Sequence, residues 1–228
     1  MRVSRKSLLP VALLTLAPSA FAADAQVNDG DLATAPVTIA PPPSSATYFQ
    51  YGITFTGEFI ADAGPMCADQ KVGGTVVVSR SGQSCVLGSG GGVAIRVGVR
   101  AAGPWYFGGA YELSKQDPNK LLRLAILQQL RGEARYYLLP GYEFQPYGSA
   151  GLGVSGYGNE WGVDTWGPMA FLAAGVETQI SRRTVVGLAL AYRSLYFGRF
   201  TDTSNTERPA GLSHLIGLDL LLEARDPL

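Results

Sequence analysis

The stretch GGVAIRVGVR, residues 91–100, decides the fold, because two arginines interrupt an otherwise apolar segment. In a β-strand, side chains alternate between two faces. One face then carries Val93, Ile95, Val97 and Val99, and the other carries Ala94, Arg96, Gly98 and Arg100. The first face suits an apolar environment and the second a polar one.

The same two-residue rhythm recurs along the rest of the chain after residue 45. Further segments lie at 46–60, 105–114, 122–139, 146–157, 169–180, 184–198 and 211–224. Residues 120–130 also fit a helix that begins after Asn119. Leu122, Leu124 and Ile126 stay in phase with the strand pattern that follows, which favours a strand. Together these segments predict an all-β fold.

The connections between the segments alternate in length. Three are short, at 102–104, 140–145 and 181–183, and the other four are longer and more polar, the first being the 61–90 loop. Short turns at one end and long loops at the other are typical of outer-membrane barrels, with the short turns in the periplasm. We therefore predict an eight-stranded antiparallel up-and-down transmembrane β-barrel over residues 46–225.

A membrane barrel also carries aromatic girdles at the two bilayer surfaces. For the short-turn end we predict Tyr48, Trp105, Tyr106, Tyr136 and Tyr147. For the long-loop end we predict Tyr157, Trp161, Trp166, Tyr196 and Phe197.

The charged residues of the alternating segments are expected to point into the barrel. An arginine that faces lipid at mid-depth costs about 2–4 kcal/mol. The predicted interior network has five acids and five arginines, namely Glu58, Arg96, Arg100, Glu112, Arg131, Glu133, Arg135, Glu177, Arg193 and Asp219. Because an eight-stranded barrel is just wide enough for its side chains to fill, we expect a polar, largely filled interior and no open pore.

The N-terminus has the pattern of an export signal. Basic residues at positions 2, 5 and 6 precede an apolar run over residues 8–17, and Ala20-Phe21-Ala22 follows. We predict a signal peptide at 1–22 and a Pro/Ala-rich periplasmic leader at 23–45. The apolar run is about half the ~20 residues that a spanning helix needs, which argues against an N-terminal membrane anchor.

Composition and cysteine content limit the kinds of site and partner that the chain can have. Cys67 and Cys85 are the only cysteines, and in an exported protein they predict one disulfide. Together with the single His214 they are too few for a finger-like zinc site, so we expect no metal and no cofactor. The net charge is zero and no basic stripe stands out, so nucleic acid is not an expected partner.

Three patterns resemble catalytic or binding motifs but lack the context that the chemistry needs. GLGVSG (151–156) matches a dinucleotide fingerprint but lies within an alternating strand and does not lead into a helix. Ser213 and His214 resemble a hydrolase pair, but adjacent strand residues point to opposite faces and the two cannot easily pair. The interior acids are matched by arginines, which favours structural ion pairs over acid–base catalysis.

The chain resembles the small eight-stranded outer-membrane β-barrel family of Gram-negative bacteria, the OmpA transmembrane-domain, OmpX and OmpW group. The residues that carry the resemblance are RYYLLP (135–140), QPYGSAGLGV (145–154) and FLAAGVETQIS (171–181). The sequence departs from the family pattern in two ways. No peptidoglycan-binding domain follows the barrel, and the chain ends in Arg225-Asp226-Pro227-Leu228 where the family usually has an aromatic residue.

These features predict a non-enzymatic integral outer-membrane protein, a monomer, that anchors and displays its extracellular loops. Its expected partners are outer-membrane lipid or lipopolysaccharide and a protein or cell surface that contacts the 61–90 loop. The alternatives are a passive or gated channel for small solutes, including hydrophobic ones, a lipid A-modifying hydrolase, and a water-soluble barrel. The water-soluble barrel would need apolar residues inside, the reverse of this pattern.

Overall fold

The computed structural model of the chain describes residues 46–67, 71–72, 75–76, 86–116, 123–181, 183–201 and 207–228. The signal peptide predicted at 1–22 and the leader predicted at 23–45 lie outside these residues, as does Cys85. Among the described residues, no helix is long and apolar enough to cross a membrane.

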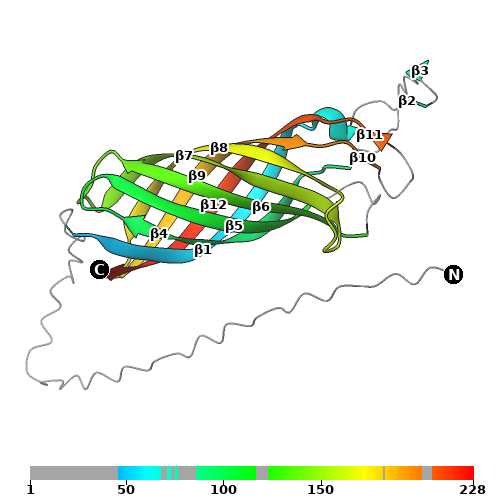
Figure 1. The fold of residues 1–228 in the computed structure, drawn as a ribbon. Helices are drawn as coiled ribbons and strands as arrows, with labels where there is room; N and C mark the ends of the chain where they lie inside the picture. The colour runs from blue at the N-terminus through cyan, green and yellow to red at the C-terminus, as the bar shows by residue number, and fades with distance from the viewer. Residues whose placement is uncertain are drawn as a thin grey trace, which may run out of the picture. The chain divides into compact units, whose positions relative to one another are not determined.

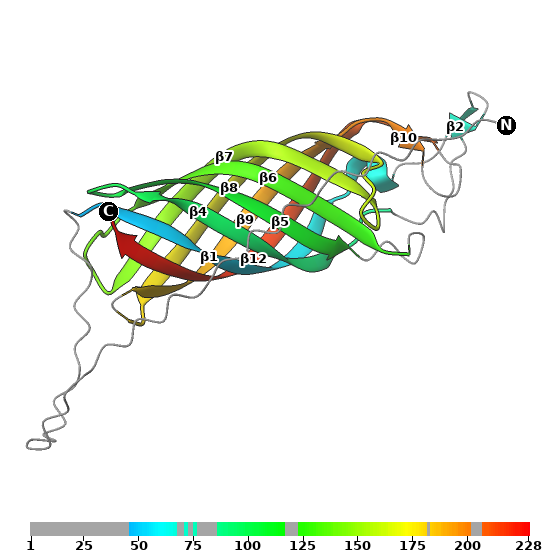
Figure 2. The ribbon, with the colours of Figure 1, turned by 60° about the horizontal axis from the view of Figure 1, so that its bottom comes forward.

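Eight long strands form a closed barrel (Figure 1 and Figure 2). They are β1 (Tyr48–Asp62), β4 (Gly90–Arg100), β5 (Trp105–Gln116), β6 (Ala125–Tyr137), β7 (Phe144–Asn159), β8 (Thr165–Gln179), β9 (Thr184–Phe197) and β12 (Gly211–Pro227). Each pairs antiparallel with its neighbours in the order β1-β12-β9-β8-β7-β6-β5-β4, and β1 closes the barrel by pairing with both β12 and β4. The predicted eight-stranded up-and-down barrel is thereby confirmed.

Smaller elements lie in the long connections. A 3-10 helix, η1 (Gly64–Cys67), follows β1, and two short hairpins are formed by β2 (Lys71–Val72) with β3 (Thr75–Val76) and by β10 (Phe200–Thr201) with β11 (Glu207–Arg208). Residues 125–137 form a strand, which agrees with the strand interpretation for this part of the segment, whereas residues 117–122 lie outside the described part of the chain.

One connection is shorter than the sequence pattern predicts. We expected a long loop between residues 157 and 169, but β7 continues to Asn159 and β8 begins at Thr165. Glu160 adopts a left-handed conformation (φ 57°), and the Gly162 amide donates to the Asn159 carbonyl at 3.1 Å. These features make a tight turn, which lets both strands extend.

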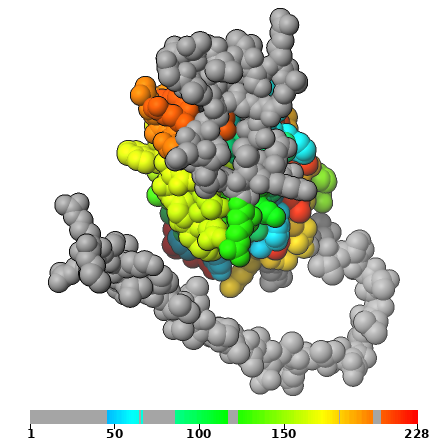
Figure 3. Space-filling view, turned by 90° about the vertical axis from the view of Figure 1, so that its right-hand side faces the viewer, coloured from blue at the N-terminus to red at the C-terminus, as the bar shows by residue number. Residues whose placement is uncertain are grey.

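The two ends of the barrel differ. The turn end carries residues 101–104, 138–143 and 180–183, together with the start of β1 and the end of β12, where the Leu228 amide donates to the Thr47 carbonyl at 3.1 Å. The loop end carries the connections 63–89, 117–124, 160–164 and 198–210. Figure 3 looks onto the loop end, where the β7–β8 turn (yellow-green) and the β10–β11 hairpin (orange) stand on the rim.

The outer face of the barrel is apolar. In β4, Ile95 points outward and is 64% exposed, whereas its neighbour Arg96 points inward and is 3% exposed. All eight long strands contribute large exposed hydrophobic side chains to this face. A water-soluble barrel has the opposite arrangement, and a lipid-facing barrel has this one.

Part of the aromatic girdle prediction is wrong. Trp105, Tyr136, Trp166 and Tyr196 point outward and are exposed, and Trp161 is exposed in the β7–β8 turn. Tyr48 is half-buried at the turn end, opposite the inward Arg100. Tyr106, Tyr147, Tyr157 and Phe197 are instead buried inside the barrel. Strand alternation is the reason, because the second residue of an adjacent aromatic pair such as Trp105-Tyr106 must face inward.

Candidate functional site

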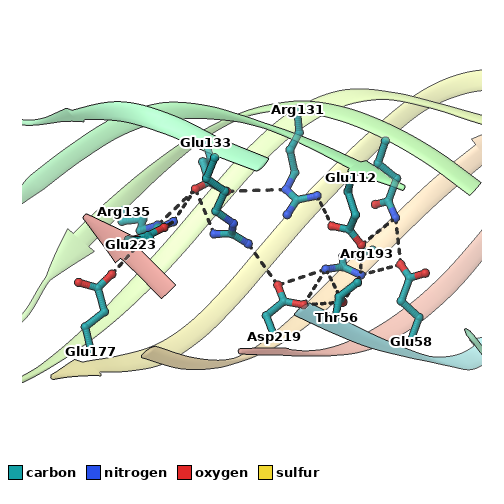
Figure 4. A network of polar contacts seen from close by, with 12 residues as sticks. Thr56, Glu58, Glu112, Arg131, Glu133, Arg135, Glu177, Arg193, Asp219 and Glu223 are labelled. Carbon is teal, nitrogen blue, oxygen red and sulfur yellow. Dashed lines mark hydrogen bonds and ion pairs between the residues drawn. The ribbon is translucent and has the colours of Figure 1, made fainter. Parts of the chain in front are cut away.

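The charged residues predicted for the interior lie inside the barrel, each at most 5% exposed. They come from β1 (Glu58), β4 (Arg96, Arg100), β5 (Glu112), β6 (Arg131, Glu133, Arg135), β8 (Glu177), β9 (Arg193) and β12 (Asp219). Their side chains meet across the lumen (Figure 4). We call this set, with Glu223 and Arg225 described below, the polar column.

Arg135 is the centre of the column near the turn end. Its guanidinium lies 2.8 Å from the Glu177 and Glu223 carboxylates and 2.9 Å from Glu133. It also stacks over the Tyr106 ring, with its Cζ atom 4.6 Å from the ring centroid. Planar guanidinium groups suit such bidentate and stacked contacts, which lysine does not reproduce.

Arg193 is the corresponding centre nearer the loop end. Its guanidinium lies 2.6 Å from Glu58, 2.9 Å from Asp219 and 3.1 Å from Glu112. Arg96 joins the two centres, since it pairs with Glu133 at 3.2 Å and with Asp219 at 3.3 Å. The ion pairs therefore form one connected network along the barrel axis.

Two charged members of the column were absent from the predicted set. Glu223 and Arg225 are buried near the turn end, where Arg225 pairs with Glu177 and donates to Gln50 Oε1 at 3.0 Å. The alternation of side chains along a strand could have predicted both, because each lies an even number of residues from the inward-facing Asp219 of β12. With them the column holds Arg96, Arg100, Arg131, Arg135, Arg193 and Arg225 against Glu58, Glu112, Glu133, Glu177, Asp219 and Glu223. The charges balance.

Not every arginine of the column is held by a carboxylate. Arg100 donates to Gln145 Oε1 at 2.7 Å and lies over the Tyr137 ring at 3.8 Å. Arg131 pairs with Glu112 at 2.8 Å, but its Nε and Nη2 atoms have no hydrogen-bond partner. A buried donor without a partner retains a desolvation cost, so these atoms are places where water or a ligand atom gains a hydrogen bond.

Towards the loop end one side of the interior becomes apolar, while Glu58, Ser114 and Gln116 keep the side formed by β1 and β5 polar. The wall there is built mainly from Leu127, Tyr157, Met169, Phe171, Phe197 and Leu215, contributed by β6, β7, β8, β9 and β12. We call this part of the interior the apolar cup. The sequence analysis did not predict the cup, because the residues that form it, such as Leu195 and Phe197 of β9, lie in segments whose two faces are both apolar.

The two described ends of the first loop lie in the apolar cup. Met66 of η1 and Val86 and Leu87, which precede β4, are fully buried in it. The Tyr157 hydroxyl donates to the Val86 carbonyl, and the Ser213 hydroxyl donates to the Ala63 carbonyl at 2.8 Å. We call Met66, Val86 and Leu87 the plug.

The predicted disulfide concerns residues beside this plug. Cys67 ends η1, and Cys85 lies outside the described residues, so the pairing stays a prediction. The Val86 amide donates to the Met66 carbonyl at 3.1 Å. Each cysteine is the neighbour in sequence of one of these two residues.

The Ser213–His214 pair is divided between the two faces, as strand alternation predicts. Ser213 is buried inside the barrel, whereas His214 is half-buried on the outer face with its Nδ1 atom 2.8 Å from the Tyr192 hydroxyl. Residues 151–156 lie within β7 and do not lead into a helix. Among the described residues, no group of His, Cys, Asp and Glu is placed to hold a metal ion.

Comparisons with known proteins identify the fold. No protein-family model matches the chain, and no curated protein matches its sequence. The crystal structure of Neisserial surface protein A is 15% identical over 78% of this chain and 96% of that chain, with a TM-score of 0.50. The outer membrane protein OprG from Pseudomonas aeruginosa is 14% identical over 80% of this chain and 97% of that one, with a TM-score of 0.51.

A third solved structure, the N-terminal β-barrel domain of Pseudomonas aeruginosa OprF, is 16% identical over 76% of this chain and 96% of that chain, with a TM-score of 0.37. The first two similarities show that the chain has the fold of the small outer-membrane barrels. The fold expected from the sequence resemblance is thus confirmed.

Proposed function

We propose that this chain is a non-enzymatic integral outer-membrane protein whose barrel anchors and displays its extracellular loops. The observation that carries the proposal is the pairing of an apolar outer face with a charge-balanced, buried polar column. A lipid bilayer accommodates the apolar outer face. The polar column fills the lumen, and its own charges sum to zero. The similarity in fold to outer-membrane proteins supports the same location.

The loop end is the extracellular side in this proposal. Short periplasmic turns and longer extracellular loops are the usual arrangement of outer-membrane barrels. The connection 63–89 is the longest of the chain, and its two stems are fixed in the barrel mouth through the plug. A loop whose base is held by the barrel is presented with less conformational freedom, which lowers the entropic cost of binding. Its partner would be a protein or cell surface.

A single-channel recording tests the filled lumen. The chain from Ala23 is refolded into a planar bilayer after an unboiled gel has shown a compact, heat-modifiable barrel. We expect no steady conductance, because the side chains of the polar column meet across the lumen. Stable openings would make solute transport the leading function and would contradict the anchoring role.

A loop deletion tests the display role. Removing residues 68–84 leaves Met66, Val86 and Leu87 in place, so the barrel mouth should stay closed. The matched control shortens 203–205 in the connection between β10 and β11. Cells or vesicles that carry the first variant should lose adhesion to host or bacterial surfaces, and those that carry the control should keep it. Adhesion that survives the first deletion would move the contact to another loop.

A further inference from the structure

The lipid-facing surface of the barrel is hollowed on one side. The hollow has a volume of about 890 Å³ and extends from Trp105 in β5 to Ile216 in β12. Its floor consists of small outward-facing residues from three neighbouring strands, namely Ala134 of β6, Gly148 and Ala150 of β7, and Ala174 of β8. We call this hollow the outer groove.

Large side chains wall the outer groove at both ends, and contacts of their own hold them in place. At the turn end, the Trp105 and Tyr136 rings meet edge to face, with their centroids 4.9 Å apart. At the other end, the Tyr192 hydroxyl lies 2.8 Å from Nδ1 of His214, and the two rings stack. Because these walls are already fixed, an occupant of the groove binds at a lower entropic cost.

The outer groove is about as long as one bilayer leaflet is deep. One row of paired residues runs along it, from Trp105 through Tyr136, Gly148 and Ala174 to Leu190. This row crosses from β5 to β9, which are four strand spacings apart in the barrel. At about 4.8 Å for each spacing and a strand tilt of about 35–45°, the row rises about 11–14 Å along the barrel axis. Half of the apolar band of an outer-membrane barrel is about 12 Å.

We propose that the outer groove binds one acyl chain of a phospholipid from the bilayer leaflet at the turn end. The acyl chain lies over Gly148 and Ala174. The head group lies beside Trp105 and Tyr136, whose indole N–H and phenol O–H can donate to its ester and phosphate oxygens. A second copy of the protein, related by a two-fold axis, would place hollow against hollow and leave the space empty. The inference rests on the membrane location in the proposed function but not on the display of loops.

A variant that fills the outer groove tests the proposal. Apart from its chain neighbours, no atom of the described residues lies within 4 Å of a Cβ atom built on Gly148, so Gly148→Leu should form the barrel. Gly57 has the same free space on the outer face of β1 and lies outside the groove, so Gly57→Leu is the matched control.

Each chain is refolded into vesicles of phosphatidylethanolamine and phosphatidylglycerol, extracted into mild detergent and measured by native mass spectrometry. The native chain and Gly57→Leu should each retain about one phospholipid. Gly148→Leu should retain about fivefold less, because its side chain takes the contacts that the acyl chain makes with the floor.

A spin-labelled phospholipid gives a second measurement, in the intact bilayer. Phosphatidylglycerol labelled near the end of one acyl chain should show an immobilised component in the electron paramagnetic resonance spectrum. This component should be larger by about one lipid per barrel for the native chain than for Gly148→Leu. Ala174→Leu fills another part of the same floor and should behave as Gly148→Leu does.

Two results would overturn the proposal. If the native chain and Gly148→Leu retain and immobilise lipid equally, the outer groove is ordinary barrel surface. If the native chain is a dimer in the mass spectrum and Gly148→Leu is a monomer, a second copy occupies the groove. An unboiled gel shows that each variant has formed the barrel, so both results leave the membrane location intact. Failure of the native chain to insert into vesicles would contradict the proposed function as well.

Discussion

Single residues in the polar column are expected to carry unequal shares of the stability. Arg135 contacts Glu133, Glu177 and Glu223, and none of these side chains is exposed by more than a few per cent. Arg135→Gln should lower the free energy of unfolding by about 3–5 kcal/mol, because it leaves buried carboxylates without their guanidinium partner. Urea unfolding in lipid vesicles measures this change.

The matched control for Arg135 is another arginine with an exposed partner. Arg183 lies 3.4 Å from Asp226, but the two side chains are 73% and 40% exposed. Arg183→Gln should change the stability by less than about 1 kcal/mol, because exposed ion pairs contribute little. Equal losses in the two variants would show that the column does not act as a connected, buried network.

Two adjacent glycines make a second test at this scale. A Cβ atom on Gly108 would lie 2.2 Å from the Tyr106 hydroxyl and 2.6 Å from the Val97 carbonyl oxygen. A Cβ atom on Gly109, which faces outward, would meet nothing nearer than 3.5 Å. Gly108→Ala should therefore cost about 1–3 kcal/mol in vesicle unfolding, and Gly109→Ala should cost little. If both substitutions are tolerated equally, the Tyr106 ring does not need the space that Gly108 leaves.

At the scale of elements, β4 offers the sharpest test of the lipid-facing surface. Ile95→Arg places a charge on the exposed outer face of β4 and should cost about 2–4 kcal/mol in vesicle unfolding. Leu138→Arg serves as the control, since Leu138 follows β6 at the turn end and is also exposed. Its cost should be about 0–1 kcal/mol, because the penalty falls towards the bilayer surface. A similar small cost at both positions would argue against a membrane location.

The first loop is the element that carries both cysteines, Cys67 and Cys85. The Val86 amide donates to the Met66 carbonyl, and Cys85 and Cys67 are the neighbours of these residues in sequence. We predict that the folded chain has no free thiol, and that reduction lowers the free energy of unfolding by about 3 kcal/mol through the released loop. Thiol labelling with and without denaturant measures the first, and unfolding with and without reductant measures the second. Rapid labelling of the folded, unreduced chain would contradict the pairing.

The alternation of apolar and polar residues predicted the strands well, but it did not predict the interior at the loop end. Both results have one physical reason. Where one face of a strand is polar, as in GGVAIRVGVR, the alternation shows which side chains face lipid and which face the lumen. Around Leu195-Tyr196-Phe197 both faces are apolar, so parity gives no contrast and the buried Phe197 resembles a girdle residue. The plug was not predictable either, because Met66 and Leu87 lie outside the barrel strands and follow no strand period.

The whole molecule has two closures in series along the barrel axis. The plug fills the apolar cup at the loop end, and the polar column fills the lumen from there to the turn end. The two closures use different physics, since the plug depends on non-directional apolar contact and the column on hydrogen-bonded ion pairs. Loss of one closure should therefore leave the other in place.

A variant without plug side chains separates the two closures. Replacing Met66, Val86 and Leu87 together by glycine opens the cup to water but leaves the contacts of Arg135, Arg96 and Arg193 intact. We expect the folded variant to show no steady conductance in a planar bilayer, although water-soluble quenchers should now reach a label at Met169. The native chain with the same label is the control and should be protected. Steady openings in the variant would mean that the plug alone seals the barrel and that the polar column leaves a continuous path for ions.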